Sequence, residues 1–433
     1  MKIYSLFPIT RIYQVAAIIL LAFRAAYAQS SHDPFTGDQL YADVKKYVSF
    51  GIHRTASEGD LKTSAWIKKK LDALGFKTSY TTFPVKQFFL KDAHVSINDT
   101  SIPAFPLWPV QQASANINGV IVDPLYGDFE LYTSKIVLVR IPPGGQTNQQ
   151  IISLLEPIIA AGASGIVAIA KNDIGEIVAY NTSENLPPWK VPVVVVAPKD
   201  SLAFIQAACA RRQVSLQVNG TLRETEARSV TGTIGTGNKY IVISTPISGW
   251  FTCGGERGPG IAIFNALAAW AAQQKSQYTF LFTANSGHEL NNLGAHVFIE
   301  KAPKPEDVYL WLHLGAGIAT VDWKKEDGTL KKLSTVDPKR NIMYSENLEH
   351  TIDLAFRDQP GKRWKIRNEA LGELAVVAAH GYKRFFGIAY GHPLHHMPTD
   401  DATTTNPKIL QDAAIAIRKA LEIELAETIV KTD

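Results

Sequence analysis

Short apolar runs alternate with helical segments through the second half of the chain, and no other feature of the sequence constrains the fold as much. Four runs have the near-continuous apolar character of strands buried on both faces: Tyr240–Ser244, Tyr278–Thr283, Val308–Leu314 and Arg384–Ala389. Helical segments lie between or after them: Pro259–Gln274, Leu348–Arg357, Ala370–His380 and Pro407–Glu427. We therefore predict an α/β three-layer sandwich, in which helices cover both faces of a mostly parallel mixed sheet.

The first half of the chain divides into two parts of different character. Two segments with helical spacing lead into a strand at Phe76–Phe83, so residues 33–96 and 223–433 are assigned to the sandwich. Residues 97–222 instead contain short apolar strands around one clear helix, Gln149–Ala161. We predict that this stretch is a β-rich module inserted into the sandwich.

Residues 1–28 have the composition of a secretory signal peptide. Lys2 and Arg11 precede an apolar run at 15–23, and the sequence Ala25-Ala26-Tyr27-Ala28 provides small residues where signal peptidase needs them. We expect cleavage after Ala28 and export to the periplasm or beyond. The alternative is an uncleaved membrane anchor, but the run is shorter than the roughly 20 residues that a spanning helix needs.

The charge balance argues against a nucleic-acid or membrane-surface partner. The whole chain has 44 Lys and Arg against 40 Asp and Glu, a formal net charge of +4. Residues 1–28 carry three of the basic side chains and no acidic one, so the mature chain keeps only about +1. The two cysteines are too few for a disulfide framework.

Four polar segments follow the predicted strands at their carboxyl ends. They are rich in glycine, histidine and carboxylate side chains, and they cover residues 244–260, 285–294, 313–317 and 391–400. Because ligands of parallel α/β sheets bind at the carboxyl ends of the strands, we expect these segments to build one convergent site.

Together these loops resemble those of the zinc-dependent aminopeptidase family that includes aminopeptidase Y, carboxypeptidase Q and the glutaminyl cyclases. The stretch His53–Asp60, which leads into a helix, resembles the opening of that family's domain. Residues 135–140 and 160–166 resemble parts of the protease-associated (PA) domain that is often inserted at this point. The resemblance covers nearly the whole mature chain and implies that residues 97–222 are a PA domain.

The resemblance also implies a metal site. Family members usually hold two zinc ions with a His-x-Asp motif, a bridging Asp, a Glu-Glu pair, a further Asp and a C-terminal His. Here Pro246–Ser248 stands at the His-x-Asp position and Gly315 at the further Asp, so one ion loses its private ligands. Glu256 stands at the bridging Asp, Glu289 at the second Glu and His396 at the C-terminal His. These three residues would hold one zinc ion with water as a fourth ligand.

His288 stands where the family has its general base. A neutral imidazole can take a proton from a metal-bound water, so His288 is a candidate base, although it could equally be a fourth ligand. Arg257 directly follows Glu256 and could instead neutralise it in an ion pair. The leading hypothesis is an exported hydrolase for a peptide-like or amide-bearing small molecule, rather than a general aminopeptidase.

Other interpretations remain open. The site could be a relic filled by salt bridges, or the pocket of a catalytically silent module that binds a ligand. Alternatively, Ser248 or Cys253 could be a nucleophile with His288 or His396 as its base, although no Gly-x-Ser-x-Gly motif supports this. One polar, glycine-rich loop contains Ser248, Cys253 and Arg257, which suggests a reworked pocket.

Three further histidines are expected near the site. His313 is expected to be structural, and either His392 or His395 is expected to orient the ligand His396. The substrate and the oligomeric state are left open by the sequence.

Overall fold

The computed structural model describes residues 33–110, 113–127, 132–141, 148–181, 187–327, 329–367 and 369–430. The predicted signal peptide, residues 1–28, lies outside these described residues. No helix among them combines the length and the apolar character of a membrane span. Within the same residues, 13 strands join into one continuous sheet that runs through both parts of the molecule.

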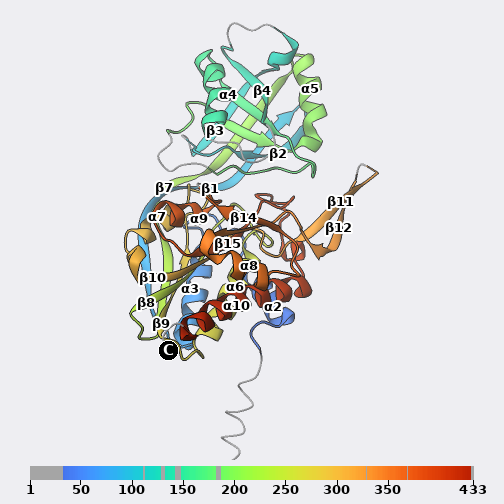
Figure 1. Cartoon of the computed structure of the whole chain (residues 1–433). Coiled ribbons are helices and arrows are strands. Elements are labelled where there is room, and N and C mark those ends of the chain that lie inside the picture. Colours follow the sequence, from blue (N-terminus) through green and yellow to red (C-terminus); the bar gives the residue numbers. More distant parts are fainter. Residues whose placement is uncertain are drawn as a thin grey trace, which may run out of the picture.

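The larger part is the three-layer sandwich that the sequence predicts (Figure 1). Its sheet follows the order β7 (Gln213–Ile234), β9 (Tyr278–Asn285), β8 (Lys239–Pro246), β10 (Val308–Leu314), β15 (Phe385–Ala389), β13 (Asn341–Ser345) and β14 (Lys362–Ile366). The four central strands, β9, β8, β10 and β15, are parallel to one another. Since β7 and β13 are antiparallel to their neighbours β9 and β15, the sheet is mixed but mostly parallel.

Alternate residues of the central strands point to opposite faces of the sheet, and each face has its own helical layer. Ile241 and Ile243 pack in a core with α2 (Gly37–Val48), α3 (Glu58–Ala73), α6 (Gly258–Ala271), α8 (Glu349–Ala355) and α10 (Pro407–Val430). Val242 packs on the other face, in a core with α7 (Leu293–Ile299) and α9 (Glu373–Ala379). This two-sided burial explains the near-continuous apolar runs of these strands.

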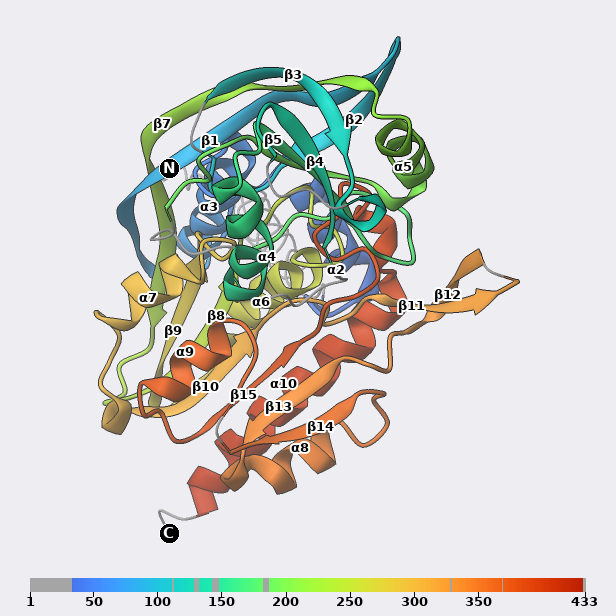
Figure 2. The same cartoon turned by 90° about the horizontal axis from the view of Figure 1, so that it is seen from above.

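The inserted part is a closed barrel that lies over the sandwich when the molecule is viewed from above (Figure 2). Its strands, in order around the barrel, are β1 (Lys77–Ile97), β2 (Thr100–Pro106), β6 (Val193–Val196), β5 (Gly165–Ala170), β4 (Lys135–Ile141), β3 (Ser114–Val122) and β7, which pairs again with β1. The helices α4 (Asn148–Ala160) and α5 (Ser201–Cys209) complete it. The strands β1 and β7 are long enough to belong to both parts, so they connect the barrel to the sandwich without a flexible linker.

Smaller elements complete the described chain. A hairpin of β11 (Val321–Glu326) and β12 (Thr329–Val336) projects from the side of the sandwich (Figure 1). Short 3-10 turns lie at Pro124–Tyr126, Pro198–Asp200, Pro305–Asp307, Glu346–Leu348 and Ala402–Thr404. Asn406 caps α10, because its side-chain oxygen accepts a hydrogen bond from the backbone N–H of Ile409.

Candidate functional site

A pocket of about 670 Å³ lies between the carboxyl ends of the central strands and the segment of the insert that follows β5. The sandwich contributes residues that the sequence analysis placed in one site: His288, His313, Gly315, His395 and His396. The insert contributes residues 171–172 and 178–181 to the opposite wall. The strand-end loops therefore converge, and the insert covers them.

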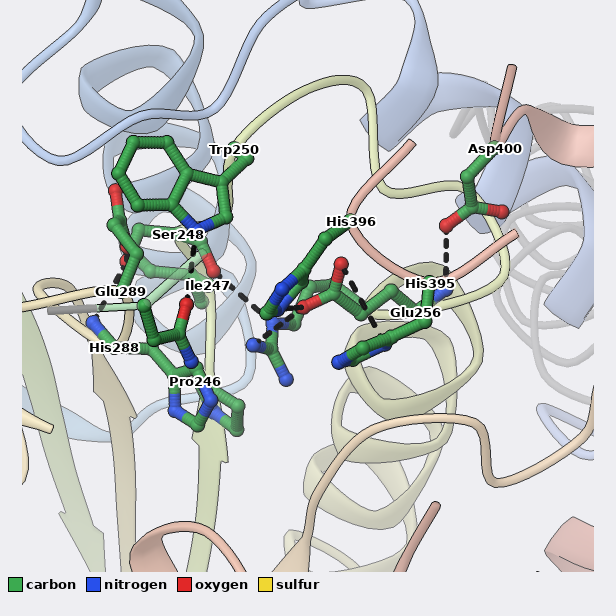
Figure 3. A network of polar contacts seen from close by, with 12 residues as sticks. Pro246, Ile247, Ser248, Trp250, Glu256, His288, Glu289, His395, His396 and Asp400 are labelled. Atoms are coloured by element: carbon green, nitrogen blue, oxygen red, sulfur yellow. Dashed lines mark hydrogen bonds and ion pairs between the residues drawn. The ribbon is translucent and has the colours of Figure 1, made fainter. Parts of the chain in front are cut away.

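Three side chains beside this pocket form a candidate metal centre. Glu256, His395 and His396 each offer a ligand atom, and these atoms all lie within 4.8 Å of one another. Nε2 of His396 lies 3.6 Å from Oε1 of Glu256, and Nδ1 of His395 lies 3.9 Å from Oε2 (Figure 3). Two of the three, Glu256 and His396, are ligands that the resemblance implies.

The backbone and the insert together aim His396 at Glu256. His396 has a positive φ of 59°, an uncommon conformation for a residue other than glycine. Its Nδ1 lies 3.1 Å from the carbonyl oxygen of Ala179 and donates to it, while the N–H of Ala179 donates to the carbonyl of His396 at 3.0 Å. This bond uses Nδ1, so Nε2 is the ring nitrogen that faces Glu256 and would bind a metal.

Three ligand atoms of this group are buried without an aligned hydrogen bond. They are the two oxygens of Glu256 and Nδ1 of His395. The ring of His395 stacks on that of His396 with centroids 3.9 Å apart. Burial, followed by the neighbouring His396, holds the pKa of His395 well below its usual value, so the ring is neutral. A donor set of two imidazoles and one carboxylate fits zinc.

Arg257 competes with a metal for the same carboxylate. Its Nη2 lies 2.7 Å from Oε1 of Glu256 with both side chains almost fully buried, and its Nε donates to the carbonyl of Ser248 at 3.0 Å. Burial alone would raise the pKa of Glu256, but the neighbouring positive charge of Arg257 above all holds the pKa well below its usual value. The carboxylate is therefore ionised, whether a metal or the guanidinium alone balances it.

The structure does not bring Glu289, the third ligand implied by the resemblance, into this group. Its Oε1 accepts from the backbone N–H of Thr55 at 2.5 Å, and its Oε2 accepts from the hydroxyl of Ser248 at 2.8 Å. Ser248 and Glu289 form a separate group beside Trp250 (Figure 3). His395, which the sequence analysis considered only as a supporting residue, takes the third position instead.

The two candidate nucleophiles are held in structural roles. The Ser248 hydroxyl donates to Glu289 and accepts from the backbone N–H groups of Gly287 and His288, at 2.8 and 3.1 Å. No imidazole ring is among its hydrogen-bond partners in the described part of the chain. Burial, followed by the nearby Glu256 charge, raises the pKa of the Cys253 thiol well above its usual value, which opposes formation of a thiolate.

His288 lines the pocket and contacts a carboxylate that the sequence analysis did not consider. Its Nδ1 lies 3.4 Å from Oε1 of Glu373, the first residue of α9. Burial, followed by the charge of Arg257, holds the pKa of His288 well below its usual value. The ring is therefore neutral, as a proton acceptor must be.

The remaining predicted histidines have distinct places. Nδ1 of His313 lies 3.0 Å from the hydroxyl of Ser244, and burial lowers the pKa of His313 to about 4. His392 lines the pocket, with its ring 5.8 Å from that of His395 and its Nε2 3.5 Å from Oδ2 of Asp400. Asp400, another residue that the sequence analysis missed, accepts from the backbone N–H groups of Gly255 and Glu256 and so holds the loop that carries Glu256.

Gly315 stands where the resemblance places a lost ligand, and the surrounding backbone leaves no room for a side chain there. A Cβ at this position would lie 2.7 Å from the carbonyl oxygen of Ile388 and 3.4 Å from Nε2 of His313. The second metal position of the family thus cannot be rebuilt here by exchanging one side chain.

Comparison with known proteins identifies the fold but no close relative. No family model matches the sequence, and no curated protein matches it. The structure matches a zinc aminopeptidase from Bacillus subtilis with a TM-score of 0.69 at 14% identity, over 90% of this chain and 96% of that chain. It matches a peptidase M28 precursor from Shewanella amazonensis with a TM-score of 0.70 at 16% identity, over the same shares of the two chains.

An aminopeptidase from an Aneurinibacillus species is also similar, with a TM-score of 0.61 at 13% identity, over 89% of this chain and 93% of that chain. These identities are low, so the similarity is one of fold. It confirms, at that level, the resemblance that the strand-end loops carry: the chain has the fold of the zinc aminopeptidases.

Proposed function

We propose that the protein is a hydrolase that uses one bound zinc ion to act on a peptide-like or amide substrate. The observation that carries this proposal is the convergence of Glu256, His395 and His396 beside a pocket of about 670 Å³. The two oxygens of Glu256 and Nδ1 of His395 are buried there without an aligned hydrogen bond. These three residues would hold the metal. His395 takes the position that the sequence analysis gave to Glu289.

The chemistry divides between the metal and the chain. A bound zinc ion would polarise a carbonyl and lower the pKa of a water ligand. His288 lines the same pocket with a neutral ring, and it accepts a proton at the nitrogen turned away from Glu373. The insert, through residues 171–172 and 178–181, forms one wall of the pocket and would hold the substrate against the strand ends. In this proposal the enzyme works after export.

The second candidate function is metal-free ligand binding. The close ion pair of Arg257 and Glu256 favours it, because the guanidinium balances the carboxylate without any added cation. In that case the pocket binds a small molecule and converts nothing.

A substrate screen separates the two functions. The mature protein is stripped with a chelator and assayed against amide and short-peptide libraries, with and without added zinc. We expect zinc-dependent hydrolysis that falls by 10²–10⁴-fold in His288→Gln, which is the range of a lost general base. The matched control is His296→Gln, an exposed histidine of α7, which should keep full activity. Hydrolysis that is independent of zinc, or ligand binding without turnover, would reject the zinc-hydrolase proposal.

A further inference from the structure

A chain of buried hydrogen bonds runs from strand β9 to His288. The hydroxyl of Thr283 donates to Oδ1 of Asn285 at 2.7 Å, and Nδ2 of Asn285 donates to Oε2 of Glu373 at 2.9 Å. The other carboxylate oxygen of Glu373, Oε1, lies 3.4 Å from Nδ1 of His288. Thr283, Asn285 and Glu373 are each no more than 2% exposed, so water does not compete for these bonds.

The order of donors is fixed from Thr283 to Glu373. Because the Thr283 hydroxyl donates to the oxygen of the Asn285 amide, the nitrogen of that amide faces Glu373. Glu373 therefore accepts on its Asn285 side, and its second oxygen is available to accept from an imidazole N–H. A carboxylate in this position selects the imidazole tautomer that carries its proton on Nδ1.

We infer that Glu373 is the positioning residue for His288: it accepts a hydrogen bond from Nδ1–H and leaves Nε2 unprotonated toward the pocket. This inference rests on the role proposed above for His288. It names the residue that keeps the imidazole ready to accept a proton. The metal candidates Glu256, His395 and His396 take no part in this chain of bonds.

The arrangement predicts what an amide does in place of the carboxylate. In Glu373→Gln, the new amide must still present an oxygen to Nδ2 of Asn285, so its NH₂ group faces Nδ1 of His288. The proton of His288 then moves to Nε2. In the double variant Glu373→Gln with Asn285→Asp, the carboxylate and the amide have exchanged places. The carboxylate introduced at position 285 accepts from both Thr283 and the new NH₂ group, and the amide oxygen again accepts from Nδ1 of His288.

NMR of ¹⁵N-histidine-labelled mature protein tests the inference without a substrate. Long-range ¹H–¹⁵N correlations report which ring nitrogen carries the proton, and the His288→Gln variant assigns the His288 signals. The chelator-treated wild type should show His288 protonated at Nδ1. The Glu373→Gln variant should exchange the two nitrogen shifts, and the double variant should restore them.

Either of two results overturns the inference: a wild-type His288 protonated at Nε2, or a tautomer that Glu373→Gln leaves unchanged. The signals of the other histidines and the melting temperature report whether each variant is folded. The wild-type measurement stands even if a variant does not fold. Since every sample is metal-free, the result is independent of zinc content and turnover, which decide the proposed function.

Discussion

Nδ1 of His396 lies 3.1 Å from the carbonyl oxygen of Ala179, so a residue of the insert sets the tautomer of a metal-ligand candidate in the sandwich. A second hydrogen bond joins the sandwich to the insert: the indole N–H of Trp250 donates to Oδ1 of Asn181 at 2.9 Å. Asn172 stabilises the turn at residues 170–176 in the segment of the insert that borders the pocket. Its side chain forms hydrogen bonds with backbone groups of residues 170, 174, 175 and 176. The insert is therefore part of the site rather than an appendage to it.

Ser248→Ala is predicted to lower stability rather than remove a nucleophile. The substitution leaves a carboxylate oxygen of Glu289 and the N–H groups of Gly287 and His288 without their buried partner. Each unmade bond of this kind costs about 1–3 kcal/mol, and urea denaturation measures the loss. The control is Ser79→Ala, which removes an exposed hydroxyl bonded to Thr231 and should change stability by less than about 0.5 kcal/mol. Unchanged stability with lost activity would instead support the nucleophile hypothesis.

Arg257→Met is predicted to make the fold depend on zinc. In the presence of a chelator, the substitution leaves the Glu256 carboxylate buried without a counter-charge, which costs about 3–5 kcal/mol. A bound cation replaces the lost charge, so zinc should raise the melting temperature of Arg257→Met more than that of the wild type.

The control for this prediction is Arg140→Met. It breaks a comparable ion pair to the buried Asp123 in the insert, at 2.6 Å, away from the metal candidates. Zinc should not rescue it. Equal effects of zinc on both variants would contradict a metal site at Glu256.

Asp60 is predicted to make the protein less stable as the pH rises from about 6.5 to 8. Burial raises the pKa of Asp60 from 3.8 to about 8, against the hydrogen bonds from Ser286 and Ala56. The folded chain therefore keeps a proton that the unfolded chain has released. The stability linked to this proton is full below pH 3.8 and is lost as the pH rises toward 8.

His53 gives the free energy of unfolding the opposite dependence on pH, mainly at lower pH. Burial lowers the pKa of His53 from 6.5 to about 3, so the protonated unfolded chain is favoured as the pH falls below 6.5. Burial lowers the pKa values of His288, His313 and His395 in the same sense, so the Asp60 contribution is measured as the difference between the wild type and Asp60→Asn. In urea titrations, the free energy of unfolding of the wild type relative to that of Asp60→Asn should fall by on the order of 1–2 kcal/mol between pH 6.5 and 8. The exposed Asp38→Asn should keep the wild-type profile, and an unchanged profile in Asp60→Asn would mean that Asp60 is ionised in the fold.

The central strands were predictable because strands buried on both faces have near-continuous apolar sequences. Residues 308–314 form β10 at the predicted bounds, since this run is almost entirely apolar. The predicted strand Phe76–Phe83 proved too short, because β1 continues to Ile97 through a stretch in which buried and exposed residues are mixed. Its partner β7 stabilises that extension along the whole length, and such long-range pairing leaves only a weak local pattern.

The loops of the site were predictable from the sequence, but the third member of the group Glu256, His395 and His396 was not. Glu289 lies in the expected loop, yet its oxygens bond to Ser248 and to Thr55, which is 234 residues away in the sequence. The positive φ of His396 aims two consecutive imidazoles toward Glu256, and this backbone state has no signature in the sequence. The choice of His395 over Glu289 depends on these tertiary contacts. The identity of the insert as a PA domain and the signal peptide stay predictions.

Zinc content tests the account most directly. The mature wild type, Glu289→Gln and His395→Ala are each dialysed against zinc, freed of excess metal, checked for folding by their melting temperatures and measured by atomic emission. The structure-based ligand set predicts about one zinc per chain in the wild type and in Glu289→Gln, and a loss of it in His395→Ala. A wild type without zinc, or a loss in Glu289→Gln with retention in His395→Ala, would contradict a centre built by Glu256, His395 and His396.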